Sequence, residues 1–267
     1  MNHAELISNI NQQKNCLCVG LDTDIEKLPI HLRGDIESII VFNKQIIDAT
    51  LSHCIAYKVN TAFYESLGWR GWQILEETFK YIPSSHLKIA DAKRADIGNT
   101  SRQYAKAFFE VMEADAVTVS PYMGLDCLEP FFAYKNKFTI VLGLTSNEGS
   151  NDFENLDTTN GKLYEEVIQK TAAKYGADQA MFVVGATKAI QMKEIRQLIP
   201  NHFLLVPGVG AQGGSLAETI ANGRNADTGL LINASRSIIY ASSGEDFAIK
   251  AAEEAEKVAD EMKQLLS

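Results

Sequence analysis

Short apolar runs rich in β-branched residues recur along the whole chain, and each has the length of a buried strand. They occupy residues 16–22, 54–60, 87–93, 115–120, 138–146, 179–187, 202–210 and 228–235. The runs are almost continuously apolar, as expected of strands that are buried on both faces. Amphipathic helix patterns, such as the one at 162–176, separate them. The pattern therefore predicts an α/β protein with the architecture of a (β/α)₈ TIM barrel.

The chain is predicted to form a single domain over residues 1–267. With 46% hydrophobic residues it can build one large core, and no low-complexity block or Pro/Gly linker divides it. The most loop-like stretch, 146–161, is polar and lies between a predicted strand and a predicted helix, so we interpret it as an active-site loop. A doubly wound open sheet is the alternative architecture, but the first strand lacks the G-x-G-x-x-G turn of its dinucleotide-binding form.

Composition indicates which partners and which cellular compartment to expect. The 34 acidic and 25 basic residues give a net charge of −9, so no overall positive field attracts nucleic acid or anionic lipid. No apolar run approaches the roughly 20 residues that a bilayer span needs, and the first residues lack a signal-peptide pattern. The four cysteines show no metal-binding spacing, and three belong to apolar strand runs. We therefore expect a cytoplasmic protein with buried thiols and with no nucleic-acid or membrane partner.

Polar residues gather at the carboxyl ends of the predicted strands, where barrel enzymes carry their chemistry. These strand-end residues are Asp22, Lys58, Asn60, Asp91, Lys93, Ser146, Asn233 and Arg236. Three histidines, His53, His86 and His202, precede strands instead, which places them at the opposite end of the barrel. We therefore expect neither a histidine metal site nor a Ser/His/Asp triad.

The segment 90–101, ADAKRADIGNTS, carries most of the candidate chemistry. Asp91 and Lys93 are two residues apart on a strand, so both side chains are expected to face the barrel mouth. Lys58 ends the neighbouring strand and adds a second ammonium, while Asp96 adds a second carboxylate. This pattern predicts an alternating array of lysines and aspartates. A structural ion pair is the alternative interpretation, because such pairs also form without any chemistry.

The signature D-x-K-x-x-D at the end of strand three, with a lysine at the end of strand two, is that of the orotidine 5′-monophosphate decarboxylase family. The chain resembles this family residue by residue at Asp91, Lys93, Asp96 and Lys58. Sugar-phosphate enzymes of the same barrel superfamily share D-x-K-x-x-D. The blocks YKVNTAFYESLG, DAKRADIGNTS, SPYMGLD, PGVGAQGG and NASRSIIYAS extend the resemblance, to the branch found in many bacteria, over essentially the whole chain.

The resemblance implies an activity and a set of catalytic residues. The family removes CO₂ from orotidine 5′-monophosphate, giving uridine 5′-monophosphate in pyrimidine biosynthesis, and it does so without a cofactor. The catalytic residues implied are Lys58, Asp91, Lys93 and Asp96, with Lys93 stabilising a carbanion and donating the proton. The resemblance also implies a homodimer with shared active sites, in which Asp96 and Thr100 serve the partner's site.

The remaining candidate residues are expected to bind the nucleotide. The glycine-rich segment after strand seven and an arginine after strand eight are typical of a barrel phosphate site. The resemblance assigns the phosphate to Gln212 and Arg236, the ribose to Asp22 and Thr100, and the pyrimidine to Ser146; Gly208, Gly210 and Asn60 complete the predicted binding residues. The alternatives are a flexible turn beside a surface arginine, helix capping by Ser146 or Thr100, and a turn cap at Asp22.

Three other functions remain open at this stage. One is a metal-assisted decarboxylase or isomerase of a sugar phosphate, which magnesium dependence would reveal. Another is an aldolase that forms a Schiff base on Lys58 or Lys93, which borohydride would trap. The third is a non-catalytic nucleotide-binding barrel, against which the retention of two lysines and two aspartates argues, since an unused charge network is costly.

Overall fold

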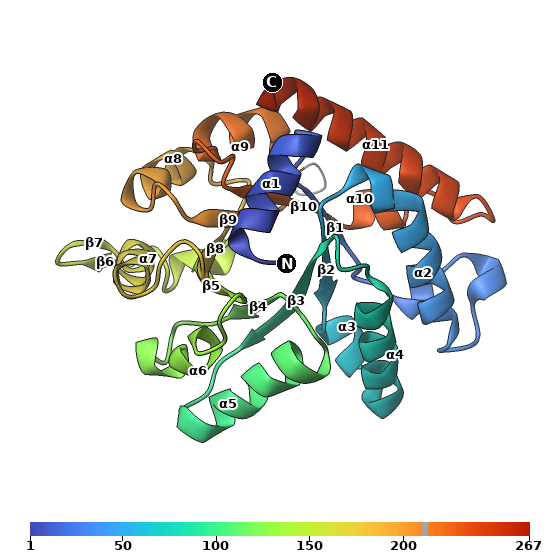
Figure 1. Cartoon of the computed structure of the whole chain (residues 1–267), viewed down its shortest axis with the longest axis horizontal. Coiled ribbons are helices and arrows are strands. Elements are labelled where there is room, and N and C mark those ends of the chain that lie inside the picture. Colours follow the sequence, from blue (N-terminus) through green and yellow to red (C-terminus); the bar gives the residue numbers. More distant parts are fainter. Residues whose placement is uncertain (210–212) are drawn as a thin grey trace.

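The computed structural model describes residues 1–209 and 213–267 and has at its centre a closed barrel of eight parallel strands (Figure 1). The barrel strands are β1 (Leu17–Gly20), β2 (Ala56–Asn60), β3 (Leu87–Arg94), β4 (Ala116–Val119), β5 (Phe138–Leu144), β8 (Ala180–Val184), β9 (Phe203–Pro207) and β10 (Leu230–Ala234). They lie in the order β1-β10-β9-β8-β5-β4-β3-β2, so the last strand pairs with the first. The predicted TIM barrel and its eight strands are confirmed.

Helices follow each strand and surround the barrel. The α-helices are α1 (His3–Gln13), α2 (Ser38–Thr50), α3 (Ala62–Glu65), α4 (Gly68–Tyr81), α5 (Gly98–Lys106), α6 (Glu129–Phe132), α7 (Leu163–Lys174), α8 (Ala189–Leu198), α9 (Leu216–Gly223), α10 (Arg236–Ile239) and α11 (Phe247–Leu266). Short turns of 3₁₀-helix are η1 (Ile25–Lys27), η2 (Ile30–Leu32), η3 (Leu51–His53), η5 (Leu125–Cys127) and η6 (Glu148–Asn151), and η4 (Ala107–Val111) is a π-helical continuation of α5. No helix in the described ranges is both long and apolar enough to cross a membrane.

The core consists of two apolar clusters, one inside the barrel and one between the strands and the helices. Alternation along each strand divides the side chains between them, as in β10, where Leu231 faces inward and Leu230 and Ile232 face the helices. Helix α1 differs from the others, because Leu6 and Ile10 belong to the inner cluster. The helix therefore closes one end of the barrel, as Figure 1 shows.

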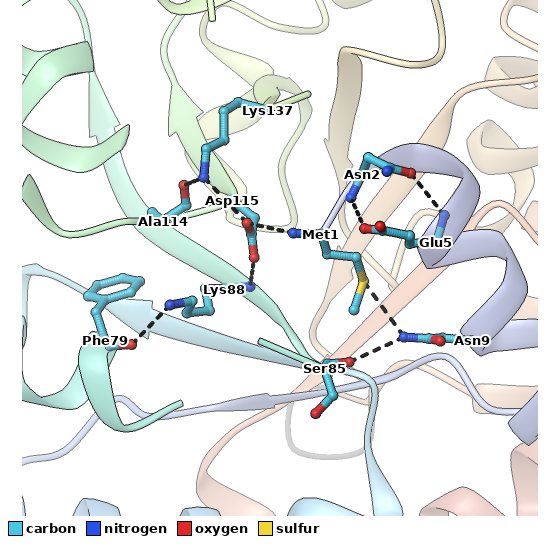
Figure 2. A network of polar contacts seen from close by, with 10 residues as sticks. All are labelled: Met1, Asn2, Glu5, Asn9, Phe79, Ser85, Lys88, Ala114, Asp115 and Lys137. Atoms are coloured by element: carbon cyan, nitrogen blue, oxygen red, sulfur yellow. Dashed lines mark hydrogen bonds and ion pairs between the residues drawn. The ribbon is translucent and has the colours of Figure 1, made fainter. Parts of the chain in front are cut away.

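A polar network fixes α1 at this closed end (Figure 2). The Met1 ammonium lies 2.8 Å from Asp115 Oδ1, and Lys137 Nζ lies 3.4 Å from the same oxygen. Asp115 Oδ2 accepts a hydrogen bond from the Lys88 backbone N–H at 3.1 Å. Asp115 and Lys137 directly precede β4 and β5, so the network lies at the amino ends of the strands. A site for a ligand is therefore expected at the opposite end of the barrel, where the carboxyl ends of the strands lie.

The polar segment 146–161 contains the turn η6 and most of a small antiparallel hairpin. The hairpin consists of β6 (Asp157–Thr158) and β7 (Gly161–Lys162). The segment lies between β5 and α7, as the sequence predicted for a loop at the carboxyl end of a strand. All four cysteines are buried and free, as expected.

Candidate active site

A cavity of about 310 Å³ opens at the carboxyl ends of the barrel strands. Its described lining comprises Asp22, Lys58, Asn60, Asp91, Lys93, Leu142, Thr145, Ser146, Asn147, Val183, Leu205, Pro207, Gly208, Val209, Asn233, Ala234, Ser235, Arg236 and Ser237. One side, from β1 to β3, is charged, whereas Leu142, Val183 and Leu205 make the side from β5, β8 and β9 apolar. A ligand with one polar side and one apolar side fits such a cavity.

The charged side is a chain of alternating aspartates and lysines. Lys93 Nζ lies 2.6 Å from Asp91 Oδ1, and Lys58 Nζ lies 3.1 Å from Asp91 Oδ2. Lys58 Nζ also lies 3.3 Å from Asp22 Oδ1. The observed order is therefore Asp22, Lys58, Asp91, Lys93. The alternating array is present, but within one chain Asp22 takes the terminal place that the sequence suggested for Asp96.

Burial and charge act against each other on the two inner members of this array. Burial by itself raises the pKa of Asp91, but the ammonium groups of Lys58 and Lys93 outweigh it and hold that pKa well below its ordinary value. Burial likewise lowers the pKa of Lys58, and the carboxylates of Asp22 and Asp91 outweigh it and raise that pKa. Both groups therefore stay charged at neutral pH. Lys93 is the most exposed member of the array, with half of its side-chain surface accessible to solvent.

Strand β3 is irregular where the array forms. Its pairing with β4 shifts in register between Ala90 and Arg94, and Lys93 has a φ of 46°. This is left-handed backbone, which is costly for a residue with a side chain. The sequence argument relied on regular strand alternation to bring Asp91 and Lys93 together. Their contact is present, but it forms across this irregularity.

The loop after β5 forms another wall of the cavity through Thr145, Ser146 and Asn147. The Glu154 carboxylate holds this loop, because it accepts hydrogen bonds from the Thr145 backbone N–H at 2.7 Å and from the Thr145 hydroxyl at 2.9 Å. Asn147, not Ser146, is the N-cap residue of η6. The capping alternative for Ser146 is therefore wrong.

Arg236 and Gly208 lie at the β9 and β10 end of the cavity. Gly208 has a φ of 98°, which favours glycine, and its carbonyl accepts a hydrogen bond from Gly214 N–H at 3.2 Å. A Cβ atom on Gly214 would lie 2.9 Å from that carbonyl oxygen, so the turn needs glycine there too. The predicted binding residues Gly210 and Gln212 lie outside the described residues.

Asp22 and Asn60 also line the cavity, as predicted for substrate-binding residues. Asp22 contacts Lys58, and it is Asp24 that caps a turn, by accepting a hydrogen bond from the Glu26 N–H at 3.0 Å. The turn-capping alternative for Asp22 is therefore wrong.

Asp96 and Thr100 are absent from the described lining of the cavity. Asp96 is partly exposed between β3 and α5, and Thr100 is exposed in the first turn of α5. The N-cap position of α5 is Ile97, so Thr100 does not cap the helix. Within one chain, the structure thus separates these two residues from the other candidates.

Two buried polar residues at the site, Thr118 and Asn233, were not among the predicted catalytic or binding residues, and neither were the more exposed lining residues Thr145, Asn147, Ser235 and Ser237. Thr118 contacts both Asp91 and Lys93, and its sequence signal is a hydroxyl placed between two valines in the strand run at 115–120. Asn233 lines the cavity, is 7% exposed and donates a hydrogen bond to Ser235 Oγ at 3.1 Å. Its signal was its position at a strand end. No group of three or more His, Cys, Asp or Glu side chains in the described ranges is arranged to hold a metal ion.

A family model described as "Orotidine 5′-phosphate decarboxylase / HUMPS family" matches residues 15–252. The chain belongs to this family. The predicted family is therefore confirmed, and the match includes every barrel strand.

Relatives in the decarboxylase family match along nearly the full chain. The orotidine 5′-phosphate decarboxylase of Phocaeicola vulgatus is 51% identical over 270 residues, which cover 100% of this chain and 99% of the relative. That of Porphyromonas gingivalis is 53% identical over 259 residues, covering 96% and 94%.

Solved structures of the family share the fold. The Leishmania donovani OMP decarboxylase superposes with a TM-score of 0.83 at 34% identity, covering 97% of this chain and 99% of that one. The Plasmodium berghei orotidine 5′-monophosphate decarboxylase gives a TM-score of 0.81 at 29% identity, covering 98% and 97%. Similarity to the decarboxylase family thus extends from sequence to architecture.

Proposed function

We propose that this chain decarboxylates orotidine 5′-monophosphate to uridine 5′-monophosphate in pyrimidine biosynthesis, without a cofactor. The observation that carries the proposal is the array at the cavity, in which the Lys93 ammonium lies 2.6 Å from a buried Asp91 carboxylate. The names of relatives about half identical to this chain support it against the sugar-phosphate alternative.

Loss of CO₂ from C6 of the pyrimidine breaks the bond to the carboxylate and leaves the electron pair on C6. The Lys93 ammonium stabilises this charge and then transfers a proton to C6, after which solvent reprotonates the amine. Asp91 lies beside the position of the substrate carboxylate, and its repulsion favours departure of CO₂. Lys58 forms an ion pair with the second oxygen of Asp91 and another ion pair with Asp22. The protein thus supplies preorganised charge.

The predicted binding residues divide among the parts of the nucleotide. Asp22 and Asn60 serve the ribose side, Ser146 binds the pyrimidine amide, and Arg236 binds the phosphate with Gly208, Gly210 and Gln212. Two lining features support this division. Arg236 and Gly208 lie together at one end of the cavity, and Asp22 adjoins Lys58 at the charged side. Phosphate binding remote from C6 can then contribute to lowering the chemical barrier.

Arg236→Ala is expected to weaken the binding of uridine 5′-monophosphate far more than that of uridine. The reason is that the guanidinium contributes a charge-assisted contact only to the phosphate, and loss of such a contact costs roughly tenfold to a hundredfold in affinity. Inhibition constants of the two ligands for wild type and variant measure the difference. Equal losses for both ligands would show that Arg236 has a structural role.

We also propose a homodimer in which Asp96 and Thr100 complete the partner's site. Both residues lie outside the cavity of their own chain, on a surface with exposed apolar side chains: Ile97 is 60% exposed, Tyr122 80% and Met123 49%. The segment around Asp96 and the segment that follows β4 are linked, because the Ser101 hydroxyl contacts the carbonyl oxygens of Asp96 and Cys127, each at 2.9 Å. Such a surface is typical of contact with a second copy.

We further propose that residues 1–267 form a single domain that works in the cytoplasm. The pairing of β1 with β10 joins the two ends of the strand sequence into one barrel, which supports the single domain. The four cysteines are buried without a disulfide, which is typical of a reducing compartment.

The proposed function predicts that purified, chelator-treated protein lowers the absorbance of orotidine 5′-monophosphate as uridine 5′-monophosphate forms. Chelation removes a loosely held metal, so the assay also separates this reaction from the metal-assisted alternative. Absence of turnover by folded protein, or magnesium-dependent turnover of a sugar phosphate instead, would overturn the proposal.

A further inference from the structure

Thr118 is a buried polar residue in the middle of an otherwise apolar strand. Strand β4 reads AVTV, and the Thr118 side chain has no exposed surface. Ala116, two residues earlier, belongs to the apolar cluster inside the barrel, so alternation directs Thr118 to the same interior. A buried hydroxyl is unfavourable unless it is hydrogen-bonded, which makes its partners informative.

Both partners of the Thr118 hydroxyl belong to the catalytic array. Its oxygen accepts a hydrogen bond from the Lys93 backbone N–H at 2.9 Å, and it donates to Asp91 Oδ1 at 3.0 Å. The same Asp91 oxygen lies 2.6 Å from Lys93 Nζ. Since an amide N–H can only donate and the ionised carboxylate can only accept, the direction of both hydrogen bonds is fixed.

The backbone geometry of Lys93 shows why this contact matters. Lys93 is in left-handed backbone where β3 loses its register with β4, so regular strand pairing does not hold its N–H. The hydroxyl of Thr118 supplies the missing acceptor. Costly backbone conformations persist only where the surroundings impose them, and Thr118 is part of that surrounding structure.

We propose that Thr118 is a positioning residue for decarboxylation, an inference that rests on the proposed function. Its hydroxyl fixes at once the backbone from which the Lys93 side chain departs and the carboxylate oxygen to which the Lys93 ammonium is bound. Thr118 is not part of the described cavity lining, so it acts on the substrate only through these two residues. It therefore fixes the position of the Lys93 ammonium relative to the Asp91 carboxylate.

The test compares Thr118→Val, which keeps the shape and removes the hydroxyl, with Thr118→Ser, which keeps the hydroxyl. Losing two hydrogen bonds to charged or strained groups is expected to lower the kcat of the valine variant by roughly tenfold to a hundredfold. The serine variant is expected to recover most of this loss. The inhibition constant of uridine 5′-monophosphate should stay near wild type in both, because that ligand lacks the reacting carboxylate.

A matched control is Thr219→Val in α9, which also removes a buried hydroxyl but one with no hydrogen-bond partner among the described residues. Its kcat should equal that of wild type. Unchanged kcat in Thr118→Val, failure of serine to restore it, or an equal loss in the control would each overturn the role of Thr118. If the valine variant does not fold, Thr118→Ala replaces it in the same comparison. Absence of wild-type turnover would instead refute the proposed function.

Discussion

Lys93→Ala is expected to lower kcat by roughly four to seven orders of magnitude while the protein still folds. The estimate combines about 10²–10⁴ for loss of a positioned general acid with about 10²–10³ for loss of charge stabilisation. Folding should survive because half of the Lys93 side-chain surface is exposed, and because Asp91 keeps its contacts with Lys58 and Thr118. Steady-state turnover of orotidine 5′-monophosphate measures the loss of kcat, and thermal unfolding measures whether the variant folds.

The control for this variant is Lys88→Ala, on the same strand. Lys88 Nζ contacts the Phe79 carbonyl at 3.4 Å, and Lys88 is not in the described lining of the cavity. Its kcat is expected to match wild type. Turnover by Lys93→Ala within tenfold of wild type would contradict its role as proton donor.

The fold could be predicted from the sequence because a barrel strand leaves a local signal. Both faces of such a strand are buried, so each appears as a short, nearly continuous apolar run, as in residues 138–144. Most predicted runs are longer than the observed strands, as in the run at 179–187, which continues past the end of β8 at Val184, whereas β3 extends one residue beyond its predicted run. Periodicity therefore locates a strand better than it sets its ends.

The site could be predicted only in part, because its contacts depend on register and on loops. Strand ends identified Lys58, Asp91 and Lys93, since a parallel barrel brings all strand ends to one face. The roles of Thr118 and Glu154 depend on the irregular pairing of β3 with β4 and on a loop that folds back on Thr145. Neither feature has a periodic signature in the sequence.

Asp96 lies outside the described lining of the cavity in its own chain. A mixture of inactive variants tests its proposed role in the partner's site. Lys93→Ala and Asp96→Ala are each expected to be inactive. In a hybrid dimer, the cavity of the Asp96→Ala chain keeps its own Lys93 and receives an intact Asp96 from the other chain, while the second cavity lacks both. Random exchange of equal amounts makes half of the dimers hybrid, so activity should return to roughly a quarter of wild type.

The control mixture for this experiment combines Lys93→Ala with Lys58→Ala. Both lysines line the cavity of their own chain, so each cavity of a hybrid dimer lacks one of them and no activity should return. Subunit exchange can be followed with a mass-tagged chain in both mixtures. Recovery in the Asp96 mixture alone requires that Asp96 cross to the other subunit, because a residue acting within its own chain would leave every hybrid cavity defective. Verified exchange without recovery would exclude the shared site.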